Sequence, residues 1–131
     1  MSYKKKTSRF EYEFCPVRSV CNVKGVGESN FKESINAINY IANHPEFKVG
    51  FKIFFDLVET NYHPSYEELQ GIVDVLKSHK ENFKNRIALV TQPKMSIVAK
   101  LVSIYCELAG MQMKSFQSIS EAKEWISESE T

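Results

Sequence analysis

Three residue types that act together in some hydrolases lie close together in the stretch FFDLVETNYHPSYEELQGI, residues 54–72. Asp56, His63 and Ser65 could in principle supply a carboxylate, a base and a nucleophile. Such an assembly also needs an oxyanion hole and a nucleophile turn of the GxSxG type, and the sequence has no GxSxG motif. A hydrolase is therefore third among the functions we consider, and we predict no catalytic residue.

Each of these side chains also has an ordinary structural role. A carboxylate at a strand end, such as Asp56, commonly accepts hydrogen bonds from the backbone amides of the next loop. Pro64 restricts the backbone before a helix, and Ser65 with Glu68 matches the capping pattern Ser-x-x-Glu. We interpret the stretch as a well-formed turn with a possible regulatory use.

Other patterns that could carry chemistry are weaker. The segment KGVGES, residues 24–29, lacks the third glycine of a dinucleotide fingerprint and the Gly-Lys-Ser/Thr of a P-loop, so we expect a turn. His44, His63 and His79 have no i, i+4 spacing and no neighbouring cysteine, which argues against a metal site. We expect neither a metal nor a cofactor.

The elements that must position residues 54–72 follow from hydrophobic periodicity. In chain order we expect strands over 9–14 and 17–23, a helix over 31–42, a strand over 51–57, a helix over 66–80, a strand over 86–91, a helix over 97–108, a strand over 111–116 and a helix over 118–126. This β-β-α-β-α-β-α-β-α order predicts an open α/β fold with a mixed, mostly parallel five-stranded sheet and four helices.

The apolar positions of the third predicted helix form one stripe, made of Ile97, Leu101, Ile104, Tyr105 and Leu108. The predicted strands over 51–57 and 86–91 are nearly all apolar. We therefore expect both to be central in the sheet and covered on both faces. In such sheets ligands bind beyond the carboxyl ends of the strands, where the strand order reverses, and we expect residues 54–72 to lie there.

Composition indicates one domain. The 131 residues, 43% of them hydrophobic, fit a single domain over 9–126 between a flexible leader, 1–8, and a frayed tail, 127–131. The 17 basic and 16 acidic residues nearly cancel, so we expect no nucleic-acid partner. The sequence shows no signal peptide, no transmembrane segment and no disulfide or zinc spacing among its 3 cysteines, which predicts a cytoplasmic protein.

Several segments in this order resemble a known family. They are FFDL, a helix start at SYEEL, RIALVTQ, ELAG and the ending FQSISEAKEWI. Together they resemble the STAS-like domains, the fold of bacterial anti-sigma-factor antagonists, over about residues 9–126. The nearest subgroup is small stand-alone bacterial proteins of the STAS-like and CRAL-TRIO-like superfamily.

The resemblance implies a non-catalytic domain. In the family, a partner kinase phosphorylates a serine at the start of the second helix, and the phosphate decides which protein docks. Ser65 lies at the matching helix start. The family's Asp-Ser-Ser or Asp-Ser-Gly motif is here HPSYEE, with no aspartate before Ser65 and two glutamates after it.

Two non-catalytic functions are therefore expected. The first is a regulatory or protein-interaction domain that docks through the loop 57–65 and the helix 66–80. Its candidate switch or docking residues are Ser65, Asp56, His63, Tyr62 and Glu67. The second, implied by the CRAL-TRIO-like kinship, is a small-molecule or lipid binding protein. Its apolar cleft is expected near Phe31, Tyr62, Met95 and Ile97.

A homodimer is a further expectation about partners. The first predicted strand carries Phe10, Tyr12 and Phe14 at alternate positions. If this strand lies at a sheet edge, its unpaired backbone groups can pair with a second copy of the chain.

Overall fold

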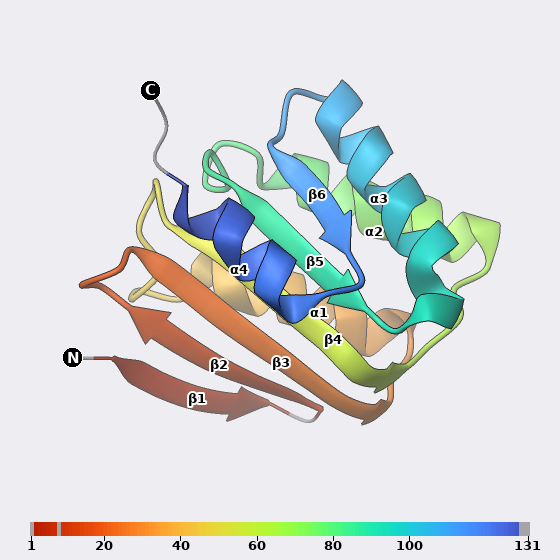
Figure 1. Ribbon diagram of the computed structural model, residues 1–131, viewed down its shortest axis with the longest axis horizontal. Helices are drawn as coiled ribbons and strands as arrows, with labels where there is room; N and C mark the ends of the chain where they lie inside the picture. Colours follow the sequence, from red (N-terminus) through yellow and green to blue (C-terminus); the bar gives the residue numbers. More distant parts are fainter. Residues whose placement is uncertain (1, 8, 129–131) are drawn as a thin grey trace.

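The computed structural model describes residues 2–7 and 9–128, which form one mixed sheet flanked by helices (Figure 1). The elements are β1 (Tyr3–Thr7), β2 (Phe10–Cys15), β3 (Val20–Glu28), α1 (Phe31–Asn43), β4 (Lys52–Asn61), α2 (Tyr66–Ser78), β5 (Ile87–Thr91), the 3-10 turn η1 (Pro93–Met95), α3 (Ser96–Leu108), β6 (Met113–Phe116) and α4 (Ile119–Ser127). The α/β class and the four helices are confirmed within these residues, whereas the sheet has six strands instead of the predicted five.

The additional strand is β1, so the prediction of a flexible leader over residues 1–8 is wrong for the part that forms it. β1 pairs antiparallel with β2 along its whole length, and Lys4 and Lys6 lie opposite Glu13 and Glu11. Opposite charges on facing positions stabilise such a pair. Because β1 covers β2, the aromatic strand is internal to the sheet, so the condition under which this strand could pair with a second copy is not met. Most of the predicted frayed tail, residues 129–131, lies outside the described residues.

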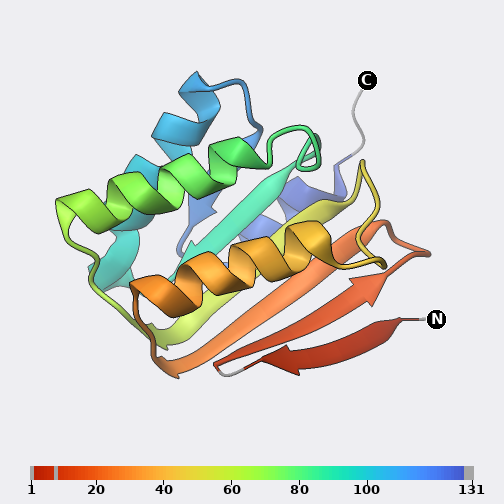
Figure 2. The same cartoon turned by 180° about the vertical axis from the view of Figure 1, so that it is seen from behind.

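The strands follow one another across the sheet in sequence order, from β1 to β6. β1, β2 and β3 are antiparallel neighbours, and β3 to β6 are parallel. Right-handed crossovers that always move in one direction place their helices on one face of the sheet. Accordingly, α1, α2 and α3 share one apolar core, while α4 packs on the other face (Figure 2). Among the described strands the order never reverses. The prediction that residues 54–72 lie at a reversal of the strand order is therefore wrong.

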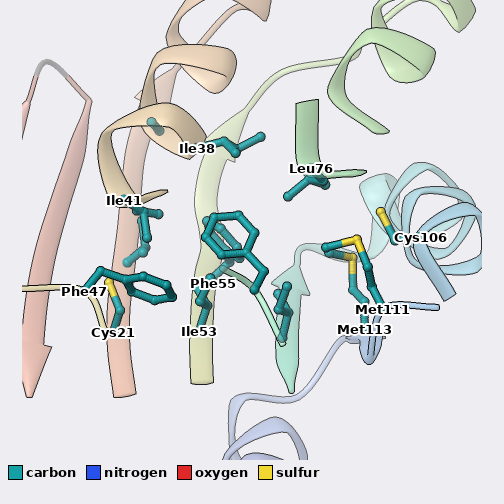
Figure 3. Packing of buried hydrophobic residues seen from close by; sticks show 14 of the residues in the cluster. Cys21, Ile38, Ile41, Phe47, Ile53, Phe55, Leu76, Cys106, Met111 and Met113 are labelled. Carbon is teal, nitrogen blue, oxygen red and sulfur yellow. The ribbon is translucent and has the colours of Figure 1, made fainter. Parts of the chain in front are cut away.

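The central strands are covered on both faces, as predicted. In β4, Ile53 and Phe55 point into the core beneath α1, α2 and α3, where Figure 3 shows both among the side chains of the cluster. Phe54, between them in sequence, packs instead in the smaller core beneath α4. This alternation is the two-residue period of a strand with an apolar layer on each side.

Gly25 of KGVGES marks a bulge, and the prediction of a turn at residues 24–29 is wrong. This segment continues β3 as far as Glu28, and the hairpin between β2 and β3 closes earlier, where the Ser19 amide donates to the Pro16 carbonyl oxygen at 3.2 Å. Gly25 lies at a register shift in the β3–β4 pairing, and a Cβ there would clash with the Thr60 side chain. The close approach of β4 therefore requires glycine at this position.

Candidate functional site

An apolar cavity of about 130 Å³ lies between the sheet and the helices α1, α2 and α3. The carboxyl-terminal parts of β4 and β5 contribute Leu57, Thr60 and Thr91 to its wall, and the loop after β4 contributes Tyr62 and Pro64. Residues 57–65 therefore border a cavity and are not part of a flat surface, but the predicted loop bounds are wrong, because β4 continues to Asn61 and only residues 62–65 form the loop. We define the rim as residues 57–65, which are the end of β4 and the loop after it, together with the first turn of α2.

Two hydroxyl groups stand out in the wall of this cavity. Ser29 Oγ, just after β3, and Thr91 Oγ1, at the end of β5, are buried and have no hydrogen-bond partner among the described residues. The Thr91 residue is only 7% exposed. A buried hydroxyl without a partner costs about 1–3 kcal/mol of stability. A molecule with an apolar body and a hydrogen-bonding group would match this wall.

Glu68 holds the rim in one conformation. Its Oε1 atom accepts hydrogen bonds from the Ser65 amide and from the Tyr62 hydroxyl, each at 3.1 Å, while Ser65 Oγ accepts from the Glu68 amide at 3.1 Å. The predicted capping box is therefore confirmed. Burial, and then the bond to Glu68, raise the pKa of Tyr62 above its usual range, so its hydroxyl remains a donor.

The structure separates the three residues considered for hydrolysis. Asp56 lines a groove between α4 and the first four strands, on the face of the sheet opposite α2. Its Oδ1 atom accepts a hydrogen bond from the Val58 amide at 3.2 Å, which is the structural role predicted for it. Ser65 caps α2, and His63 is exposed in the rim. The carboxylate is therefore not positioned to orient a histidine beside the serine.

The remaining predicted site residues lie in different places. Glu67 is exposed on the first turn of α2, and Met95 lines the cavity together with Tyr62. Phe31 packs against α2 instead. Its ring approaches Gly71 so closely that a Cβ added there would lie 2.7 Å from it. Ile97 faces solvent and is 74% exposed.

Sequence reasoning missed Ser29 and Thr91. Both are small polar residues at the carboxyl end of a strand, Ser29 just after β3 and Thr91 as the last residue of β5, and this position is the only signal that the sequence offers for them. That they meet at one cavity depends on β3, β4 and β5 lying parallel and adjacent.

The two buried cysteines outside the rim are not activated thiols. Burial raises the pKa of Cys21 to about 12 and the pKa of Cys106 to about 11, so both thiols stay protonated at neutral pH. Among the described residues, no group of three or more His, Cys, Asp or Glu side chains is arranged to hold a metal ion. None of the described helices is both long and apolar enough to cross a bilayer.

Comparisons with known proteins bear on the fold alone. No family model matches the chain, and no curated protein matches it. Among solved structures, it is similar to an uncharacterised protein of the DUF3478 family with a SpoIIAA-like fold from Shewanella loihica PV-4. The two share 15% sequence identity and superpose with a TM-score of 0.53 over 96% of this chain and 92% of the other. The chain therefore has a SpoIIAA-like fold, as its resemblance to STAS-like domains implies.

Proposed function

We propose that this protein is a non-catalytic regulatory domain that binds another protein through the rim and the exposed side of α2. The observation that carries the proposal is an exposed surface whose backbone is fixed by side-chain hydrogen bonds. His63, Tyr66 and Glu67 are exposed on a backbone that Glu68 and Ser65 hold in place. A surface that is already ordered loses little conformational entropy on binding, and exposed tyrosine is typical of interface cores.

Ser65 is the residue of this surface at which a phosphate would act. Its hydroxyl lies at the N-terminus of α2, where a phosphate would find backbone amides and a favourable helix dipole. Glu67 and Glu68, in the first turn, would repel the same phosphate. The proposal therefore rests on docking at the rim, and phosphorylation of Ser65 is not required for it.

Site-specific photo-crosslinking tests the docking proposal. A photoreactive amino acid replaces Tyr66 on the rim side, and a matched control replaces Ile119, which is exposed on α4 on the opposite face. After irradiation in extracts of the source organism, we expect one protein to be captured at position 66 and not at position 119. The additional change Glu67→Arg should reduce that capture. Equal capture at both positions, or capture only at 119, would contradict the proposal.

A second candidate function is binding of a small molecule in the cavity. The cavity supports it, because its wall is apolar apart from the hydroxyls of residues such as Ser29 and Thr91. An engineered apolar cavity of about 150 Å³ in another protein binds benzene, so a volume of this order accepts one ring or a short chain. The matching ligand is small and amphipathic, with one hydrogen-bonding group.

Phenol and benzene distinguish this candidate from plain hydrophobic binding. Phenol should raise the melting temperature of the protein more than benzene does, because its hydroxyl can pair with Thr91. In Thr91→Val this preference should disappear, and the variant without ligand should be about 1 kcal/mol more stable, since an unpaired hydroxyl is removed. If neither compound stabilises the protein, or if Thr91→Val keeps the preference, the cavity does not bind ligands in this way. Native mass spectrometry of freshly purified protein would identify any bound natural molecule.

A further inference from the structure

The helix α3 has apolar side chains on its solvent side as well as on its core side. The core side carries Ala99, Val102 and Cys106, which are buried. The solvent side carries the α3 stripe, which we define as Ile97, Leu101, Ile104 and Leu108. Ile97 and Leu108 are 74% and 79% exposed, and the two residues between them are also exposed. A surface helix normally has polar residues on this side.

The spacing of the α3 stripe is that of a helix-pairing seam. Its residues are separated by four, three and four positions, which is the spacing of the a and d positions of a heptad. At 100° per residue, all four lie within a narrow sector centred opposite the buried face. The stripe is thus suited to contact one further helix.

Charged residues flank the α3 stripe on one side only. Lys100 and Glu107 are both exposed and lie seven residues apart, so they share the same flank of the helix. The other flank carries Val98 and Tyr105, which pack against the core. Val98 also lines the apolar cavity described above. One flank therefore presents one charge of each sign and the other presents none.

We propose that the α3 stripe is a self-association surface at which two copies of the chain pair with their α3 helices antiparallel. A two-fold axis perpendicular to the helices places the charged flanks of both copies on the same side. Lys100 of each copy then lies beside Glu107 of the other. In a parallel pair, by contrast, the charged flank of one copy would face the uncharged flank of the second. The order of charges therefore selects the antiparallel arrangement.

The contact is small. From Ile97 to Leu108 the stripe extends about 17 Å at 1.5 Å per residue. A standard stable interface buries about 800 Å² on each partner and involves more elements than one short helix. The dimer should therefore be weak and should form in a concentration-dependent way.

Sedimentation velocity tests the surface. The weight-average sedimentation coefficient should rise between about 10 and 500 µM protein, because a weak dimer forms by mass action. Ile104→Glu should abolish this rise. Ile119→Glu is the matched control, because Ile119 and Ile104 are 38% and 41% exposed but lie on opposite faces of the sheet. Circular dichroism checks that both variants fold. A monomer at every concentration, or a dimer that survives Ile104→Glu, would overturn the proposal.

Charge exchange and crosslinking test the orientation. Lys100→Glu alone and Glu107→Lys alone should each weaken dimerisation several-fold, and the double variant should restore it. In addition, a mixture of Ile97→Cys and Leu108→Cys chains should form a mixed disulfide, because these positions meet in an antiparallel pair. Efficient disulfide formation between two Ile97→Cys chains, with no rescue by charge exchange, would show a parallel pair and overturn the assignment.

Discussion

At the start of α2, the Ser65 hydroxyl accepts from the Glu68 amide and the Glu68 carboxylate accepts from the Ser65 amide. These bonds satisfy backbone donors that a helix leaves without intrahelical partners. We expect Ser65→Ala to lower the free energy of unfolding by about 1 kcal/mol. Ser65→Asp should remain close to the unsubstituted protein, because aspartate keeps the acceptor and suits the helix dipole. Urea denaturation measures both. If Ser65→Asp is as unstable as Ser65→Ala, the cap is not the source of the stability.

His44 makes stability dependent on pH. Its ring stacks on Phe14 with a centroid distance of 4.2 Å, and its Nδ1 atom accepts a hydrogen bond from the Glu46 amide at 3.0 Å. Burial, and then the charge of Lys5, lower the pKa of His44 in the folded protein. The unfolded chain therefore binds a proton more readily, at about pH 6.5. The contribution of His44 to stability is complete above that pH and is lost as the pH falls through the folded pKa.

The measurement is the free energy of unfolding at about pH 7.5 and pH 5.5, on either side of the histidine pKa. Burial also lowers the pKa of His79, so the unsubstituted protein has at least two contributions to its acid sensitivity. Between the two pH values, His44→Gln should therefore lose less free energy of unfolding than the unsubstituted protein does. Some loss should remain in the variant, because His79 still contributes. An identical loss in both proteins would contradict the assignment to His44.

At the scale of elements, α4 is joined to the sheet by cations as well as by apolar packing. Lys52 Nζ donates to the Ile126 carbonyl oxygen at 2.5 Å, and Arg86 Nη1 donates to the Trp125 carbonyl oxygen at 2.7 Å. The Arg86 guanidinium also lies 5.0 Å from the centroid of the Trp125 ring. These cations satisfy carbonyl groups at the C-terminus of α4 and oppose the negative end of its dipole.

We expect Arg86→Met, which keeps an apolar stem, to lower the free energy of unfolding by about 1.5–3 kcal/mol, the range for hydrogen bonds to charged groups. Trp125, the single tryptophan, should show a red-shifted fluorescence spectrum as α4 loosens. Lys84→Met is the control, because Lys84 pairs with Glu81 at an exposed site, where an ion pair contributes little. Equal effects of the two substitutions would refute this role of Arg86.

The edge strand β1 shows how an element can limit association. Lys4, Lys5 and Lys6 are consecutive and exposed in this strand. Charged residues on an edge strand discourage further strand pairing, so β1 protects the sheet on this side. This is consistent with our placing self-association at the α3 stripe and not at the N-terminal edge.

At the scale of the whole molecule, the sequential strand order places β4 and β5 in the interior of the sheet and leaves β1 and β6 at its edges. Interior strands have neighbours on both sides and apolar layers on both faces, so their amides open only when the whole domain unfolds. We expect hydrogen exchange to be slowest in β4 and β5 and markedly faster in β1 and β6. Mass spectrometry of peptides from each strand measures this order. Equal protection of β1 and β4 would contradict it.

Much of the fold was predictable because it depends on residues that are close together in the sequence. The helix start at Ser65 is confirmed, since its cap involves a side chain and an amide three residues away. The α/β class follows from the alternation of periods. By contrast, the glycines of residues 24–29 read as a turn, because a bulge depends on the close approach of the distant β4.

The sequence by itself determined the order of the strands and α-helices from β2 to α4, the cap at Ser65 and the absence of a GxSxG motif, because these depend on local spacing. Only the tertiary structure decided that β1 covers β2, that Ser29 and Thr91 share one cavity, and that Asp56 lies on the face away from Ser65. It also decided which side of α3 is buried, since the residues of the predicted stripe face solvent except Tyr105, which is partly buried. The physical reason is that periodicity identifies an apolar face of a helix, whereas only packing decides whether that face meets the same chain or another.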